Sequence, residues 1–263
     1  MEKLDFETIL VESAKLPMVR IDRGEFLRRE LHNKYSPEVI DDAINNNPAH
    51  AGIPIEEVRK IAKSCINEEA TKVTAISTVA GIPGGLAMIG TVPVDLAQYY
   101  GFILRIVQKL IYLYGWQDLD LKSDVIDTET KNLFTLFVGI MFGAKGAVGA
   151  VQKISVQVAQ QVAKKLPQKA LTKGIIYPIV KKVATMLGVQ MTKEVFAKGV
   201  AKVVPVIGGV VSGAVTFVSY KPMCEKLRKH LETFEVANVD FYKNLNTDID
   251  IYDAENVVEL GDK

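Results

Sequence analysis

Residues that most often reveal metal binding, redox chemistry or catalysis are scarce in this sequence. Its 263 residues include two cysteines and three histidines. Cys65 and Cys224 lie far apart, in no metal-ligand or redox spacing, which favours a reduced cytosolic setting. His32, His50 and His230 match no metal-protease motif. The composition therefore predicts no metal site and no cofactor.

Signatures of common enzyme classes are missing as well. Gly84-Gly85 lacks the Lys-Ser/Thr pair of a phosphate-binding loop, and no predicted strand precedes it. Ser212 misses the glycine spacing of a nucleophile elbow by one residue and lies in an apolar stretch. Asp95 and Arg105 would be separated by roughly 15 Å along one helix, too far for direct contact. We expect no catalytic residues and a protein that is not an enzyme.

Export signals and strand patterns are two further absences. The acidic start at residues 1–5 precedes no apolar segment, so nothing predicts export. The valine-rich parts carry helical spacing rather than the strict alternation typical of strands. We predict an all-α fold, a helical bundle with three glycine-rich apolar helical hairpin units wrapped by amphipathic helices. Its parts would be N-terminal amphipathic helices (1–72), an apolar and basic core (73–230) and a helix end with an acidic flexible tail (231–263).

Long apolar runs, in contrast, are present. No ionised side chain occurs from Val73 to Val94, and about 22 residues at roughly 1.5 Å each could cross a bilayer core of about 30 Å. Pro83 interrupts this run because it lacks an N–H group, and Gly81 and Gly85 beside it add backbone freedom. We expect a broken, re-entrant or buried hairpin with these glycines in helix packing, rather than a straight transmembrane helix.

The helix predicted from Pro93 to about Gly115 is apolar over most of its surface. One stripe carries its polar groups, which are Asp95, Gln98, Arg105, Gln108, Lys109 and Tyr112. Such a helix is buried on most of its circumference. Asp95 suits the positive end of the helix dipole, and a buried pair with a lysine or arginine is the alternative. Trp116 would either close the end of a core or contact the lipid headgroup boundary.

Two more apolar units, residues 133–151 and 203–220, contain glycines four residues apart. These are Gly139 and Gly143, with Ala147 next in register, and Gly209 and Gly213. Small residues at this spacing let a second helix approach closely. We therefore predict close mutual packing of the apolar units.

Two helix starts are marked locally in the N-terminal part. Asp22 with Glu25 has the spacing of a capping box. Ser36-Pro37-Glu38 offers an N-cap hydroxyl, a proline at the first helical position and an acid in the first turn. Short helices should follow both signals.

The formal net charge of +1 conceals a separation of charge along the chain. Residues 145–202 contain eleven lysines and one acid, whereas residues 232–263 contain nine acids and two lysines. Candidate membrane contacts in the basic part are Lys153, Lys164, Lys165, Lys169, Lys173, Lys181 and Lys182. Their mixture with aliphatic residues is typical of helices that lie on anionic bilayers, and a solvated face of ordinary helices is the alternative. The lack of arginine in this part argues against a nucleic-acid partner.

Several motifs resemble one bacterial family. They are Gly81-Ile82-Pro83-Gly84-Gly85, the run from Ile89 to Tyr100, the run from Gln108 to Trp116, and upstream Leu16-Pro17 with the run from Arg20 to Leu27. Together they are similar to the EcsC family over residues 10–230. The resemblance implies an association with an ABC-transporter operon and no established reaction, so it carries over no catalytic residues.

One function is expected, with two alternatives. We expect a non-enzymatic, membrane-associated helical protein that acts from the cytosolic side, bound peripherally or re-entrantly to the inner membrane, and the resemblance implies a role as accessory to a transport system. Its partners would be an anionic membrane surface and a transporter or other protein, and an oligomer is compatible with this. The alternatives are a soluble protein that binds a lipid or other apolar ligand between its hairpins, and a membrane-perturbing or pore-forming effector.

Overall fold

The computed structural model describes residues 5–79, 88–89, 92–119, 121, 126–165, 172–190 and 212–244. These residues form an all-α fold, which confirms the predicted class. Its helices are α1 (Phe6–Ala14), η1 (Pro17–Val19), α2 (Arg23–Leu31), α3 (Pro37–Asn45), α4 (Ile55–Val79), α5 (Val94–Leu113), α6 (Thr128–Phe142), α7 (Ala147–Ala163), η2 (Gly174–Ile176), α8 (Tyr177–Gln190), α10 (Ser212–Leu231) and η3 (Glu235–Ala237). An antiparallel pair joins β1 (Met88–Ile89) to β2 (Val92–Pro93), directly before α5.

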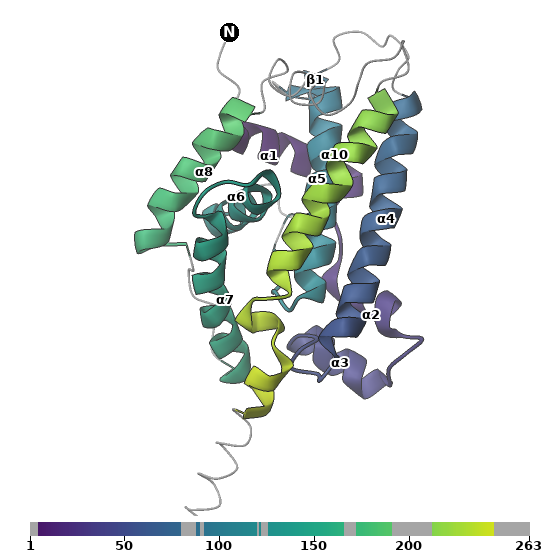
Figure 1. Ribbon diagram of the computed structural model, residues 1–263, viewed down its shortest axis with the longest axis vertical. Helices are drawn as coiled ribbons and strands as arrows, with labels where there is room; N and C mark the ends of the chain where they lie inside the picture. The colour runs from purple at the N-terminus through teal and green to yellow at the C-terminus, as the bar shows by residue number, and fades with distance from the viewer. Residues whose placement is uncertain are drawn as a thin grey trace, which may run out of the picture.

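Three long helices, α4, α5 and α10, run side by side, and α6, α7 and α8 lie on the opposite flank (Figure 1). α4 buries Ala62, Ile66 and Val73 along one stripe because these residues recur at helical spacing. α10 packs extensively against α4. One hydrophobic cluster continues from Phe6 to Tyr242, so the N-terminal helices and the segment after α10 share a core.

The burial predicted for α5 is confirmed. Exposure is 1% or less for Tyr100, Ile103, Leu104, Ile106, Val107, Leu110, Ile111 and Leu113. Gly115 ends the helix with a φ of 92°, in the left-handed region that glycine tolerates best. A Cβ atom at Gly115 would stand 2.6 Å from the carbonyl oxygen of Val236, so glycine also permits the close approach of η3.

The two N-terminal helix starts behave differently. The Asp22 carboxylate accepts a hydrogen bond from Glu25 N at 2.9 Å, as the capping-box spacing predicts. Ser36 does not cap α3 through its side chain, which corrects the second prediction. Its hydroxyl instead hydrogen-bonds the Glu38 carboxyl and lowers the pKa of that group. Pro37 still occupies the first turn, where its fixed φ suits a helix.

Gly139 allows the close helix approach predicted for the second apolar unit. A Cβ atom there would lie 2.5 Å from Cγ1 of Val183 on α8. The prediction of one small-residue face through Gly143 and Ala147 is wrong, because α6 ends at Phe142. Gly143 has a φ of 78° and terminates the helix, whereas Ala147 begins α7. The turn between the helices brings Ala147 back to Gly139, with a Cβ at Gly139 3.3 Å from that of Ala147.

Three of the other predicted packing glycines, Gly81, Gly85 and Gly209, lie outside the described residues. Gly213 lies in the first turn of α10, and its role in helix packing stays a prediction. In the described part of the chain, no helix combines the length and the apolar character that crossing a membrane requires.

Candidate functional site

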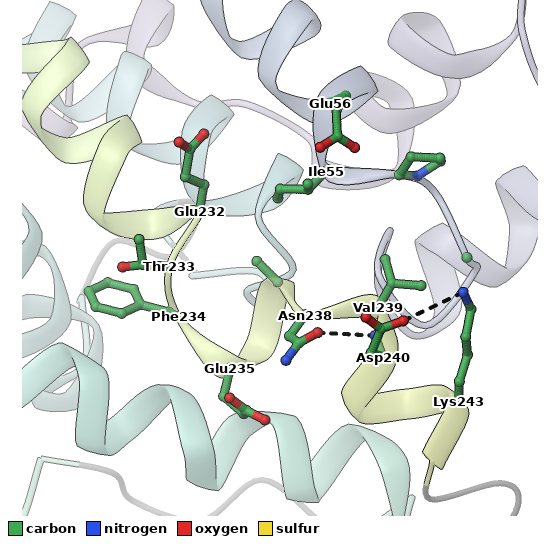
Figure 2. Close-up of a pocket in the computed structure, with 13 residues that line it drawn as sticks. Ile55, Glu56, Glu232, Thr233, Phe234, Glu235, Asn238, Val239, Asp240 and Lys243 are labelled. Atoms are coloured by element: carbon green, nitrogen blue, oxygen red, sulfur yellow. Dashed lines mark hydrogen bonds and ion pairs between the residues drawn. The ribbon is translucent and has the colours of Figure 1, made fainter.

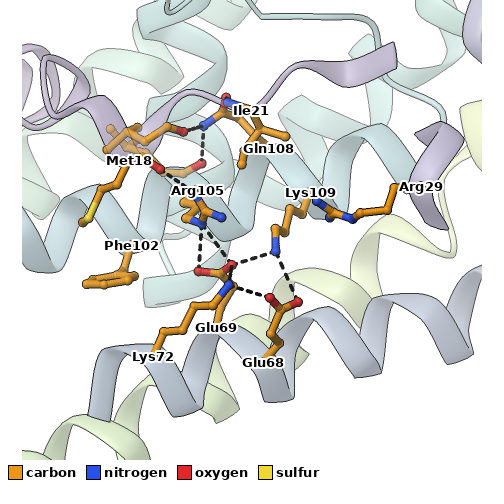
Figure 3. A network of polar contacts seen from close by, with 12 residues as sticks. Met18, Ile21, Arg29, Glu68, Glu69, Lys72, Phe102, Arg105, Gln108 and Lys109 are labelled. Atoms are coloured by element: carbon orange, nitrogen blue, oxygen red, sulfur yellow. Dashed lines mark hydrogen bonds and ion pairs between the residues drawn. The ribbon is translucent and has the colours of Figure 1, made fainter. Parts of the chain in front are cut away.

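A buried ionic cluster joins α4 to α5 (Figure 3). The side chains of Glu69 and Lys109 are 0% and 1% exposed, and Lys109 Nζ lies 2.6 Å from Glu69 Oε1. Arg105 Nε donates to both Glu69 carboxylate oxygens, at 3.0 and 3.1 Å. Lys72 Nζ lies 3.7 Å from Glu69, and the half-exposed Glu68 lies 3.6 Å from Lys109 Nζ. Three cations, Lys109, Arg105 and Lys72, therefore compensate the one fully buried carboxylate, which offsets the cost of its removal from water.

The same face of α5 also holds the segment before α2. Arg105 donates to the carbonyl oxygen of Met18. Gln108 Nε2 donates to the Val19 carbonyl oxygen at 2.8 Å, and Gln108 Oε1 accepts from Ile21 N at 3.2 Å. The cluster thus holds α4, α5 and residues 18–21 together. Its charges are compensated by neighbouring protein groups.

Arg105 and Gln108, two residues of the predicted polar stripe, form hydrogen bonds with protein groups rather than facing water. Gln98 is partly buried, and the side chain of Asp95 lies outside the described residues. The alternative of a buried pair at Asp95 therefore stays a prediction. The buried pair that the structure does contain is centred on Glu69.

Sequence reasoning missed Glu69, although a signal was present. On α4, Ala62, Ile66 and Val73 mark the apolar stripe, and Glu69 falls on the same stripe at helical spacing. A carboxylate at a core position predicts a cation facing it, because a buried charge must be paired. Lys109 belongs to the polar stripe of α5, but forty residues separate it from Glu69, so no local pattern connects the two.

The two thiols are buried and carry raised pKa values. Burial raises the pKa of Cys65 to about 12, and burial also raises the pKa of Cys224. Both thiols therefore stay protonated near neutral pH and are weak nucleophiles.

An acidic pocket lies between the start of α4 and the segment after α10 (Figure 2). Its volume is about 460 Å³, and its charged lining residues are Glu56, Glu232, Glu235, Asp240 and Lys243. Glu232 is compensated by Arg59 and Arg228, at 3.0 and 2.6 Å. Carboxylates in the pocket wall favour the binding of a cationic group and disfavour the binding of a fatty acyl chain. Within the described residues, no group of three or more histidine, cysteine or acidic side chains is placed to hold a metal ion.

The basic surface predicted from the sequence is exposed. Its described lysines are Lys153 on α7, Lys164 and Lys165 directly after it, Lys173 before η2, and Lys181 and Lys182 on α8. Lys169 lies outside the described residues. On α8 the apolar Val180, Val183 and Leu187 face the core, which turns the lysines of this helix outward. We name this set the α7–α8 lysine surface.

The lysines of the α7–α8 lysine surface differ from several other lysines of the protein in their ion pairing. Among the described residues, none of the lysines of the α7–α8 lysine surface forms an ion pair with an acid. Lys15, Lys34 and Lys60, in contrast, each lie 2.6–2.7 Å from a glutamate. The positive charge of this surface is therefore available to an external anion.

Large exposed apolar side chains occur on the same segment. They are Val156 at 39%, Ile175 at 72%, Tyr177 at 44% and Val189 at 57% exposure. Trp116 does not join them, because it is 2% exposed and packs edge-on against Phe137 with ring centroids 4.9 Å apart. Of its two interpretations, the structure therefore supports core closure, and the assignment of Trp116 as a lipid contact is corrected.

Comparison with known proteins adds no assignment, since no protein family, curated protein or solved structure matches this chain. The similarity to the EcsC family consequently stays a prediction from the sequence.

Proposed function

We propose that this protein is a peripheral membrane protein without catalytic activity, which binds anionic bilayers through the α7–α8 lysine surface. The observation that carries the proposal is that the described lysines of this surface are exposed and form no ion pair with any acid in the part of the chain that the structure describes. Each lysine near an anionic lipid surface contributes about 1 kcal/mol of binding free energy. Several acting together would hold the protein at the membrane without a spanning helix.

The charge arrangement favours a diffuse anionic surface over a specific anion site. Lysine presents a compact charge on a flexible stem, whereas planar recognition of a phosphate group commonly uses the arginine fork. Residues 145–202 contain eleven lysines and no arginine. Action from the cytosolic side as an accessory to a transport system is part of the proposal, and it is supported by the EcsC resemblance alone.

The proposal is tested by co-sedimentation with vesicles of neutral lipid or of neutral lipid mixed with phosphatidylglycerol. The triple variant Lys173→Gln, Lys181→Gln, Lys182→Gln should lose about 3 kcal/mol of binding to the anionic vesicles. The matched control is Lys63→Gln, Lys226→Gln, Lys229→Gln, which removes the same charge from exposed sites on α4 and α10. Equal losses of binding free energy in the two triple variants would mean that binding depends on net charge and not on the α7–α8 lysine surface. Equal binding of the unmodified protein to both vesicle types would overturn the proposal.

A membrane-perturbing activity gives a different result in the same vesicles. Release of a trapped dye at protein concentrations that saturate binding would favour the effector alternative. Binding without release supports the peripheral function.

A further inference from the structure

We propose that the η2 turn is an insertion wedge, in which Ile175 and Tyr177 enter the boundary between headgroups and acyl chains of an anionic bilayer. This inference rests on the proposed function and adds a depth and a point of contact to it. Lys173 and Lys181 would remain at the level of the lipid phosphates.

The wedge is built from the most exposed large apolar side chain in the described part of the protein. Ile175 in η2 is 72% exposed, and Tyr177, the first residue of α8 and two positions further on, is 44% exposed. Gly174 before them has a φ of 65°, and a Cβ atom at this position would meet nothing within 4 Å. The turn therefore projects from the protein surface, and burial of these side chains in lipid removes apolar area from water.

The base of the turn is anchored to the core. Thr172 is 2% exposed, and its hydroxyl donates to Glu129 Oε2 at 2.7 Å. The Thr172 hydroxyl oxygen also accepts a hydrogen bond from Asn132 Nδ2 at 2.9 Å. Ile176 is 6% exposed and packs into the core next to the outward-facing Ile175. Because both ends are held, little conformational freedom is lost when the tip is ordered in a bilayer.

Charge around the tip identifies the occupant as an anionic bilayer. Lys181 Nζ lies 4.9 Å from the centroid of the Tyr177 ring, and Lys173 stands two residues before Ile175. A tyrosine ring combines an apolar body with a polar hydroxyl and is enriched at membrane interfaces. Glu194 is the single acid among residues 145–202, so the sequence around the tip supplies little repulsion of anionic lipid.

The single native tryptophan makes insertion directly measurable. Trp116 is buried, and we expect its fluorescence to be unaffected by lipids that carry bromine atoms on their acyl chains. The Tyr177→Trp variant places a second indole at the wedge. Its fluorescence should be quenched in phosphatidylglycerol vesicles that contain brominated lipid, while the unmodified protein shows no change.

A binding measurement complements the quenching. Ile175→Ser should weaken binding to the same vesicles by about tenfold or more and leave a residual binding that disappears in high salt. Val156→Ser on α7 is the control, because it removes an exposed aliphatic side chain outside the turn and should leave the affinity within about twofold. Both sites are exposed, and unchanged melting of the variants would establish that folding is intact.

The outcomes separate the wedge from the function on which it rests. Salt-sensitive binding without quenching, together with an unaffected Ile175→Ser variant, would overturn the wedge and leave peripheral binding in place. Unchanged vesicle binding with loss of self-association in Ile175→Ser would assign the turn to a protein contact and also overturn it. Failure of the unmodified protein to bind anionic vesicles would overturn both.

Discussion

At the scale of single residues, replacing glycine with alanine should have opposite effects on stability in two neighbouring helices, α6 and α7. Gly139→Ala places a Cβ 2.5 Å from Val183 Cγ1, and overpacking of this kind costs about 1–3 kcal/mol. Gly149→Ala on α7 is the control, because nothing lies within 4 Å of the new Cβ and alanine favours a helix by up to about 1 kcal/mol. Urea unfolding should show the first variant destabilised and the second unchanged or stabilised. Stabilisation of both would mean that Val183 moves freely and that Gly139 is not a close contact.

Glu57 provides a residue-scale prediction for acid pH. Its carboxylate lies 2.7 Å from Lys34 Nζ and 2.6 Å from Lys60 Nζ, and these hydrogen bonds lower its pKa to about 2. Because the pKa in the folded state is below that of the unfolded chain, the contribution to stability is present above about pH 4.5 and is lost as the pH falls towards about 2. The Glu57→Gln variant should therefore have a lower urea midpoint than the unmodified protein at about pH 6. The two midpoints should converge at about pH 2. High salt should reduce the difference, since the Glu57 side chain is partly exposed and both of its lysine partners are exposed at the surface. A difference that persists at low pH would show that the charge is not its source.

At the scale of secondary-structure elements, the pairing of α4 with α5 depends on one buried charge. Glu69→Gln removes the carboxylate 2.6 Å from Lys109, which is 1% exposed, and leaves only the half-exposed Glu68 at 3.6 Å. Breaking a buried ion pair on one side costs about 3–5 kcal/mol. Glu68→Gln is the neighbouring control, because its half-exposed carboxylate contributes about 1 kcal/mol or less. Denaturant unfolding measures both variants.

A second substitution at the same pair distinguishes charge from shape. Glu69→Met combined with Lys109→Met should recover much of the stability lost in Glu69→Gln, because apolar residues of similar size often replace a buried ion pair at little cost. A double variant as unstable as the sum of its single variants would contradict direct coupling. The two remaining cations, Arg105 and Lys72, are 21% and 43% exposed and can turn towards water.

At the scale of the whole molecule, the separation of charge along the chain should regulate membrane affinity. Residues 245–263 contain six acids, Asp248, Asp250, Asp253, Glu255, Glu259 and Asp262, so replacing each with its amide changes the formal charge from +1 to +7. The full-length variant should bind phosphatidylglycerol vesicles more tightly than the unmodified protein at low salt, because less negative charge opposes the lysines. The difference should vanish in high salt, where the screening length is about 3 Å. Equal affinities at low salt would mean that these acids do not influence the binding surface.

The sequence by itself determined the fold class and many helix boundaries, because these depend on interactions within a few residues. Helical spacing predicted the burial of α5, Asp22 predicted the start of α2, and Gly115 marked the end of α5. The role of Gly143 escaped this reasoning, because the same glycine spacing occurs in a packing face and in a helix terminus. The conformation of the backbone decided between them.

Tertiary structure alone decided which distant groups meet. Glu69 finds Lys109 and Arg105 across forty and thirty-six residues, and no local pattern specifies that pairing. The sequence also left open whether Trp116 closes a core or faces lipid, since an aromatic ring suits both, and contact with Phe137 places it inside. The outward position of lysines such as Lys181, which pairs with no acid among the described residues, follows from the packing of α8. Helical spacing identifies an exposed face but not the acids that folding brings to it.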